Sequence, residues 1–284
     1  MKTAIIASGG GMTCSYSVGA ILALVDKFKL KKPDIVIGCS GSAGPLAYYV
    51  AQQYNSIRKI SKFISTKKLI NYLRVWKILN IDYLIDDIFK KIEPLNIKKL
   101  KASKIQFLIS VTNYNTGELE YFSNKDDINL FEVLRATKAM PIAYNKAISL
   151  NNKKYCDTHI STSIMLNAQK AIELGAKKLI ILDNRQTNKT MDKGFKFWLC
   201  LRNKIFRKNY KNYMTKIKQF EIPKDIEVIY IKPKEKLRVS ALSNNKHLMT
   251  ETIDLGYDEI YQREDLYTFL NARDTNDNIA QKVF

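Results

Sequence analysis

The 284-residue chain is poor in the features that mark membrane-spanning and secreted proteins. It has no uninterrupted apolar run of the ~18 residues that a membrane-spanning helix needs. Its first segment has one lysine and then only four apolar residues before a glycine cluster, which is too short for a signal peptide. We therefore expect a cytoplasmic protein without a transmembrane segment, one that can lie at the periphery of a membrane.

Cysteine and histidine are scarce, so the chain offers few metal ligands and few imidazole bases. Only His159 and His247 could supply an imidazole. The cysteines lack the paired spacing of zinc sites; they are Cys14, Cys39, Cys156 and Cys200. We expect no metal and no cofactor, and we interpret the cysteines as reduced, small core residues of a cytoplasmic protein.

Acidic residues are few compared with basic ones, 27 against 47, and the formal net charge is +20. Such a field attracts polyanions, although a genome that favours Lys, Ile and Asn codons would account for part of it. The excess of basic residues is distributed unevenly along the chain. Residues 56–80 contain seven basic residues and no acidic one, and residues 186–222 contain ten basic residues and two acidic ones.

The most informative segment that is present runs from Asp34 to Gly44, with the sequence DIVIGCSGSAG. A short apolar run ends there at a Gly-x-Ser turn, which passes directly into a sequence compatible with a helix. This is how a strand-to-helix turn presents a serine as a nucleophile, with the helix dipole aimed at its oxygen. A phosphate cradle or a plain structural turn would have the same local pattern.

A second glycine-rich turn precedes the first one in the chain. Ala4–Ala7 is expected to form a strand, followed by Ser8–Met12 and an apolar helix from Ser15. A dinucleotide fingerprint would need glycine at Cys14, and a phosphate-binding P-loop would need Gly-Lys-Ser/Thr, which is absent. Two such units in succession place both turns at one edge of a parallel sheet, where the first can supply N–H donors to an oxyanion.

Together these segments resemble the patatin-like phospholipase family. SGGGMTCSYSVGAILAL is similar to its glycine-rich oxyanion motif, and GCSGSAG to its nucleophile turn. Further similar segments follow in the family's order, ending in the place of its catalytic Asp-Gly-Gly or Asp-Gly-Ala: they are Ser110–Glu118, Leu134–Pro141 and Tyr155–His159. The resemblance covers residues 1–185 and implies a three-layer α/β/α sandwich with a mainly parallel central sheet. Residues 186–284 would be a basic helical extension packed on this core.

The resemblance also implies a serine–aspartate dyad and a serine acyl hydrolase of phospholipase A or lysophospholipase type. Ser40 would attack the acyl carbonyl and Asp157 would accept its proton. The oxyanion would be held by the glycine-rich loop, which comprises Gly9, Gly10, Gly11 and Met12. A Ser–His–Asp arrangement through His159 is the minority alternative, since no second acid stands in an obvious position to orient that imidazole.

Three departures from the family pattern bear on activity. Thr13-Cys14 replaces the usual Arg-Gly, so a cationic contribution near the oxyanion loop is missing or comes from elsewhere. Thr158-His159 stands where the family has Gly-Gly or Gly-Ala. Loss of the glycine is expected to restrict the backbone conformations available to this turn. The turn is Gly-x-Ser-x-Ser, so Ser42 is an alternative nucleophile, and Pro45 would then lie in a first helical turn.

The two basic regions fit a protein that meets anionic lipid. Residues 194–208 combine aromatic and basic side chains in the manner of a segment that lies in a membrane interface. The structural alternative is a helix that packs Phe197, Leu201 and Ile205 onto the domain. The expected partners are phospholipid or lysophospholipid and an anionic membrane surface, and nucleic acid is unlikely because no nucleic-acid-binding signature is present. A catalytically weakened lipid-binding protein is the alternative function.

Apolar periodicity predicts one α/β domain in this chain, whose hydrophobic content is 46%. Strands are expected at residues 4–7, 35–37, 105–112, 178–182 and 225–231, and a hairpin-like pair at 118–122 and 147–150. Helices are expected at residues 15–29, 43–55, 56–79, 82–91, 129–138, 161–175, 195–218, 251–261 and 264–272. The end of the chain, residues 274–284, is expected to be frayed.

Overall fold

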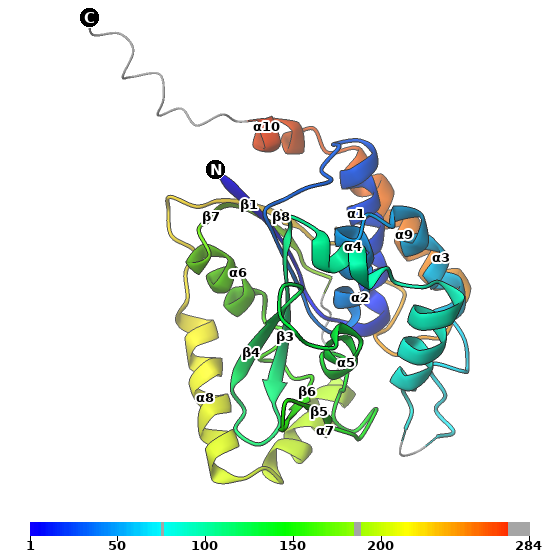
Figure 1. Ribbon diagram of the computed structural model, residues 1–284, viewed down its shortest axis with the longest axis vertical. Coiled ribbons are helices and arrows are strands. Elements are labelled where there is room, and N and C mark those ends of the chain that lie inside the picture. Colours follow the sequence, from blue (N-terminus) through cyan, green and yellow to red (C-terminus); the bar gives the residue numbers. More distant parts are fainter. Residues whose placement is uncertain (75–76, 185–188, 272–284) are drawn as a thin grey trace, which may run out of the picture.

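A computed structural model describes residues 1–74, 77–184 and 189–271. A mixed, mainly parallel sheet runs through the centre, with helices on both of its faces, so the architecture is a three-layer α/β/α arrangement (Figure 1). The strand order is β5-β6-β3-β2-β1-β7-β8, with β4 paired to β3 outside this path. The fold class predicted from the sequence is confirmed.

The parallel strands run from the middle of the sheet to one of its edges, and most of their buried residues are apolar. Both faces of these strands are covered, which explains their continuous hydrophobic runs. They are β1 (Lys2–Ala7), β2 (Ile35–Gly38), β3 (Gln106–Asn113), β7 (Ala176–Leu182) and β8 (Glu227–Ile231). The antiparallel strands are β4 (Leu119–Ser123), β5 (Ile148–Leu150) and β6 (Lys153–Cys156).

Two helical layers cover the sheet. The larger layer contains α1 (Ser15–Asp26), α2 (Ser40–Val50), α3 (Tyr54–Ile64), the π-helix η2 (Tyr83–Ile92), α4 (Ile97–Ala102), α5 (Leu130–Ala136) and α9 (Lys246–Tyr261). Helices α6 (Ile164–Glu173) and α8 (Lys204–Gln219) lie on the other side (Figure 1). The remaining helical segments are η1 (Gly11–Cys14), α7 (Lys189–Cys200) and α10 (Asp265–Asn271).

The C-terminal part of the chain contributes to the same core as the N-terminal part. Strand β8 extends the sheet beside β7, and α9 packs along α1. The two helices approach closely at Gly19, where an added Cβ would lie 1.9 Å from the Ile253 carbonyl oxygen. The division of the chain at residue 185 remains a prediction.

The predicted helix over residues 56–79 is wrong in its second half, because α3 ends at Ile64. The hydroxyls of Ser65 and Thr66 donate to backbone carbonyls of the preceding turn, and this competes with helix continuation. The chain then forms a loop closed by an antiparallel bridge between Ile70 and Leu79. Trp76 of this predicted segment lies outside the described residues, as do residues 186–188, Ala272 and the predicted frayed end at 274–284.

Other predicted elements need correction in their pairing or bounds. The expected hairpin between residues 118–122 and 147–150 is wrong, because β4 pairs with β3 and β5 pairs with β6. The helix expected over 195–218 is two helices, since the Asn203 side chain accepts from the Phe206 N–H and starts α8 afresh. Helix α2 begins at Ser40 rather than at residue 43. Strand β6 and helix α4 were not anticipated.

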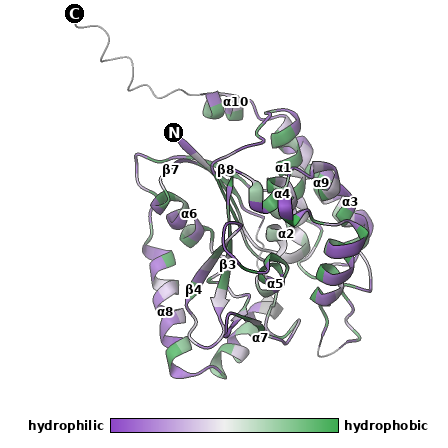
Figure 2. Ribbon diagram, viewed as in Figure 1, coloured by the Kyte–Doolittle hydropathy of each residue, from purple (hydrophilic) through white to green (hydrophobic). Residues whose placement is uncertain are grey.

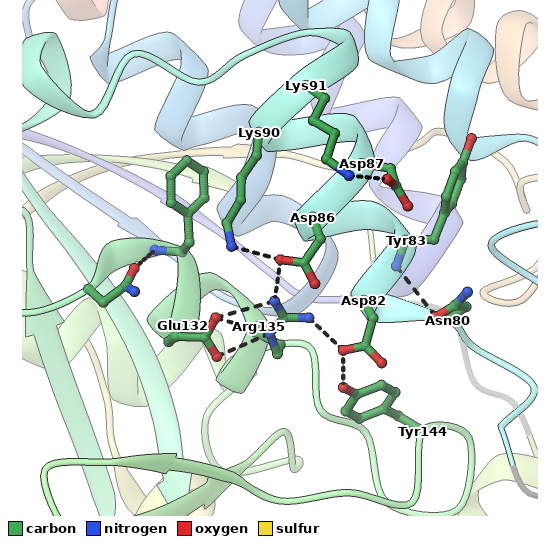
Figure 3. Close-up of polar contacts among 12 residues, drawn as sticks. Asn80, Asp82, Tyr83, Asp86, Asp87, Lys90, Lys91, Glu132, Arg135 and Tyr144 are labelled. Carbon is green, nitrogen blue, oxygen red and sulfur yellow. Dashed lines mark hydrogen bonds and ion pairs between the residues drawn. The ribbon is translucent and has the colours of Figure 1, made fainter.

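A buried arginine ties η2 to α5. Arg135 donates to Asp82 at 2.5 Å, to Asp86 at 2.8 Å and to Glu132 at 3.1 Å, as Figure 3 shows. Tyr144 also donates to Asp82. Besides the buried apolar face of η2, which is formed by Leu84, Ile85, Ile88 and Phe89, this one guanidinium joins the start of η2 to α5.

Arg135→Met is expected to lower the free energy of unfolding by about 2–4 kcal/mol, since three carboxylates lose a buried partner. Thermal unfolding followed by circular dichroism measures the change. Arg58→Met is the matched control, because Arg58 forms a half-exposed pair with Asp254 and should cost at most ~1 kcal/mol. Equal stability of the two variants would contradict a structural role for Arg135.

Candidate active site

Ser40 lies where β2 gives way to α2, in a backbone conformation that side chains rarely adopt. Its φ is +48°, in the left-handed region, which is costly for a residue other than glycine. Two neighbouring residues hold its peptide groups. The Ser40 N–H donates to the Thr137 hydroxyl at 2.9 Å, and the Lys138 ammonium donates to the Ser40 carbonyl oxygen at 2.7 Å. A strained serine fixed in this way has the geometry of a nucleophile turn.

Asp157 follows β6, and its buried side chain contacts the Ser40 hydroxyl. Its backbone N–H donates to the Ala139 carbonyl at 3.0 Å, and the Ser161 hydroxyl donates to its carboxylate at 3.3 Å. Burial raises the pKa of Asp157 to about 7, although contacts with Ser40 and the charge of Lys138 act in the opposite direction. The carboxyl group is therefore poised to exchange a proton near neutral pH.

Lys138 is buried beside this pair, at the end of the segment that contains α5. Burial lowers the pKa of its ammonium to about 8, and the charge of Asp157 counteracts that shift. A cation therefore lies near Ser40 even though Thr13-Cys14 replaces the family's Arg-Gly. Local patterning did not reveal Lys138, because a lysine after a helix is usually exposed and only the packing of α5 against α2 and β3 turns it inward.

The glycine-rich loop lies directly against the serine. An added Cβ on Gly9 would come within 3.1 Å of the Ser40 Cβ. Gly10 and Gly11 have φ of +148° and +60°, so the loop needs glycine there. The Met12 N–H donates to the Ala241 carbonyl at 3.0 Å, which occupies the donor that was expected to help hold an oxyanion.

Asn184 fastens this loop from the end of β7 and was not anticipated. Its side-chain amide donates to the Gly9 carbonyl at 3.0 Å and also accepts from the Ser17 hydroxyl. Its own N–H donates to the Ser8 hydroxyl at 3.1 Å. The sequence offered no signal for this contact, because Asn184 meets the loop only through the pairing of β1 with β7.

The alternative nucleophile Ser42 is buried two residues further along α2. Its hydroxyl donates to the Cys39 carbonyl at 2.8 Å and the Ala7 carbonyl at 3.2 Å, and accepts from the Cys39 N–H at 3.2 Å. These contacts satisfy the start of the helix in the manner of a cap. Pro45 does not lie in the first turn, because α2 begins at Ser40.

Both histidines contact acidic side chains of other segments or of their own helix. The His159 ring nitrogens face Asp192 at 3.5 Å and the Tyr210 hydroxyl at 3.4 Å, and His247 pairs with Glu251 on α9. Neither Thr158 nor His159 has a positive φ, so the expected backbone cost of replacing glycine there does not arise. Cys14, Cys39 and Cys156 are buried and form no disulfide, as predicted, but Cys200 is exposed, so its assignment to the core is wrong.

An apolar cavity of about 90 Å³ opens beside Ser40. Its wall is built from α3, η2 and the loops after α5 and β8, and includes Ile60, Leu84, Phe89, Met140 and Leu242. Ser40, Gly11 and Lys138 also line it. The arrangement places a strained serine and a cation in the wall of an apolar cavity, with a buried carboxylate beside the serine, which suits a substrate with an apolar tail and a reactive polar bond.

Fold and site together place the chain among α/β proteins with a serine at a strand-to-helix turn. The chain matches the family described as "Patatin-like phospholipase" over residues 5–166, more than half its length, and it belongs to that family.

Individual relatives are distant. The chain is 24% identical over 191 residues to the "Uncharacterized protein YjjU" of Escherichia coli (strain K12), which covers 64% of this chain and about half (51%) of that protein. Among solved structures, VipD from Legionella pneumophila has a TM-score of 0.46 at 12% identity, covering 94% of this chain and 67% of VipD. The type III effector protein ExoU has a TM-score of 0.37 at 10% identity, covering 92% and 54%.

Two further findings concern membranes and metals. Across residues 1–74, 77–184 and 189–271, no helix combines the length and apolar character needed to cross a bilayer. Within those same ranges, no three His, Cys, Asp or Glu side chains gather in a way that could hold a metal ion.

Proposed function

We propose that this protein is a serine acyl hydrolase that cleaves the acyl esters of phospholipids or lysophospholipids through a Ser40–Asp157 dyad. The observation that carries the proposal is the contact between the Ser40 hydroxyl and the buried Asp157 carboxylate. The strained backbone of Ser40 and its place in the lining of an apolar cavity support it. Family membership supports the lipid substrate class.

In the proposed reaction, the Ser40 oxygen bonds to the acyl carbon while its proton passes to Asp157. The tetrahedral oxyanion faces the N–H groups of Gly10 and Gly11, with Gly9 beside the serine. Breaking the ester bond releases the alcohol, which takes the proton back from Asp157. Water, deprotonated by the same carboxylate, then attacks the acyl-enzyme. The bond to the Ser40 oxygen breaks, that oxygen takes the proton back from Asp157, and a fatty acid leaves.

Lys138 has two roles in this proposal. Its charge lowers the pKa of Asp157 and so favours the ionised carboxylate, and its hydrogen bond to the Ser40 carbonyl holds the strained turn. It is a positioning residue, because it acts on the dyad and not on the substrate. We also propose that the acyl chain enters the apolar cavity and that the protein meets its substrate at an anionic membrane surface.

A fluorophosphonate probe, with the labelled peptide identified by mass spectrometry, tests the nucleophile. Labelling is expected at Ser40, because a phosphonylated serine mimics the tetrahedral intermediate, and it should disappear in Ser40→Ala. The matched variant Ser42→Ala should still be labelled, since the Ser42 hydroxyl bonds to backbone groups.

Other labelling results would change the proposal. Labelling at Ser42 would keep the hydrolase and replace its nucleophile. Absence of labelling in protein shown to be folded would favour the catalytically weakened, lipid-binding alternative.

A further inference from the structure

Large apolar side chains are exposed on three segments around the cavity. At the corner between α7 and α8, Phe197, Leu201 and Ile205 are 68%, 63% and 62% exposed. Leu73, in the loop after α3, is 89% exposed. We call the exposed group the docking face; its members are Tyr72, Leu73, Ile142, Phe197, Leu201 and Ile205. The alternative that Phe197, Leu201 and Ile205 pack onto the domain is therefore wrong.

These segments are neighbours of one another and of the cavity. The Leu79 N–H donates to the Ala143 carbonyl at 2.9 Å, and an added Cβ on Gly194 would lie 3.3 Å from the Ile142 side chain. The Tyr72 hydroxyl donates to the carbonyl of Leu242, which lines the cavity. The α7–α8 corner and the loop after α3 both lie at the lower end of the molecule in Figure 1, and Figure 2 shows hydrophobic colour at that corner.

The exposed corner is firmly supported from inside. Trp198 and Phe206 are buried, with their ring centroids 5.4 Å apart, and Phe206 also lies against Gly117. Asn203, between the two helices, donates to the Asn115 carbonyl at 2.9 Å. The buried aromatic residues fix the two helices, so the exposed apolar side chains are held outward by the fold.

Basic residues surround the docking face. Helix α8 carries six basic residues and no acidic one over Lys204–Gln219. Exposed cations flank the apolar side chains of the loop after α3 and of the α7–α8 corner. They are Lys67, Lys68, Lys196, Lys204, Arg207 and Lys208. Apolar side chains rimmed by cations are what an anionic lipid surface requires, since the former enter the headgroup region and the latter meet its charge.

We propose that the docking face binds an anionic phospholipid surface and turns the mouth of the cavity toward the lipid. This inference rests on the proposed function for its choice of lipid as the partner. Charge complementarity determines which lipids are preferred. Because the docking face is cationic as well as apolar, it selects anionic headgroups over neutral ones.

Flotation with vesicles tests the proposal without any need for catalysis. Full-length Ser40→Ala protein is mixed with phosphatidylcholine vesicles, with or without phosphatidylglycerol. Binding is expected only where phosphatidylglycerol is present, and it should weaken as salt is raised. Adding Phe197→Ser/Leu201→Ser should lower the affinity about tenfold or more. Leu255→Ser/Tyr261→Ser on α9, which removes two other exposed apolar side chains, should not.

A second pair of variants tests the charge. Lys204→Gln/Lys208→Gln should lower the affinity for anionic vesicles about tenfold or more, since each lysine contributes on the order of 1 kcal/mol near such a surface. Lys98→Gln/Lys99→Gln on α4 removes the same charge elsewhere and should have little effect. Thermal unfolding confirms that each variant is folded.

Three results would overturn the proposal: failure of the parent to float, equal binding to neutral vesicles, or unchanged binding of both docking-face variants. Tight RNA binding that competes with vesicles and is lost in the same variants would assign the face to nucleic acid instead. Vesicle binding by a protein that hydrolyses no ester would leave the docking face standing and overturn only the hydrolase.

Discussion

Ser40→Ala and Asp157→Asn are each expected to lower kcat/KM by at least about 10⁴-fold, and the double variant should be little worse than either alone. The two side chains act as one unit, because the serine is a weak nucleophile until the carboxylate takes its proton. Steady-state hydrolysis of a short-chain nitrophenyl ester and of a lysophospholipid measures the effect. Asparagine preserves the shape of Asp157, so the loss isolates proton transfer from packing.

The matched control is Asp225→Asn, since Asp225 is an exposed carboxylate paired with Lys177. Its activity should equal that of the parent. More than about a tenth of parental activity in Asp157→Asn would remove this residue from the role of general base.

The parent should also show an acid limb in its pH profile. The base must be ionised to act, and burial raises the pKa of Asp157 to about 7. kcat/KM should therefore fall about tenfold for each pH unit below that value. A limb near pH 4, the ordinary range of aspartate, would contradict the buried environment of this carboxylate.

Lys138→Met carries the second-largest expected effect, a decrease in kcat/KM of roughly 10²–10³-fold at pH 7. The charge of Lys138 lowers the pKa of Asp157, so its removal should move the acid limb to higher pH. In the parent, the burial-lowered pKa of Lys138 predicts a decline in activity above about pH 8 as the ammonium is neutralised. That alkaline decline should be absent in Lys138→Met.

Stability separates this role from a merely structural one. Burial disfavours the charged form of Lys138, and Asp157, with a pKa of about 7, can take up a proton once its cation is gone, so no uncompensated charge is left buried. Lys138→Met should therefore not lower the free energy of unfolding at pH 7 by more than about 1 kcal/mol. Lys138→Arg should restore part of the activity and the position of the acid limb. Lys125→Met, on an exposed loop, is the control. An unshifted acid limb in Lys138→Met would contradict the proposed action on Asp157.

Much of the fold could be read from local patterns. Buried parallel strands such as β2 and β7 are short apolar runs bounded by turn residues, and Gly175 with φ of +90° ends the α6 segment as its sequence suggests. The pairing of the strands was harder to predict, because the neighbour of β4 in the sheet depends on how several strands align with one another. Likewise, Ser65 and Thr66 ended α3 through side-chain bonds that a periodicity of apolar residues does not record.

For the site, the sequence by itself determined which residues stand at the ends of the strands. Gly9–Gly11 follow β1 and Ser40 follows β2, because apolar runs stop there and turn residues begin. Asp157 was located by the family resemblance instead, since β6 is not an apolar run and was not anticipated. Only the tertiary structure decided how they meet. The pairing of β3 with β6 brings Asp157 toward Ser40, and the packing of α5 turns Lys138 inward.

The same division holds for the surface. The sequence identified residues 194–208 as rich in aromatic and basic side chains, but a helix has two faces and composition does not say which is buried. Packing decided it: Phe195, Trp198 and Phe206 fill the space beside Cys156 and Tyr114, and Phe197, Leu201 and Ile205 are left outside. Which side of an amphipathic segment faces solvent depends on the surface it meets, and that surface is assembled from strands and loops distant in the chain.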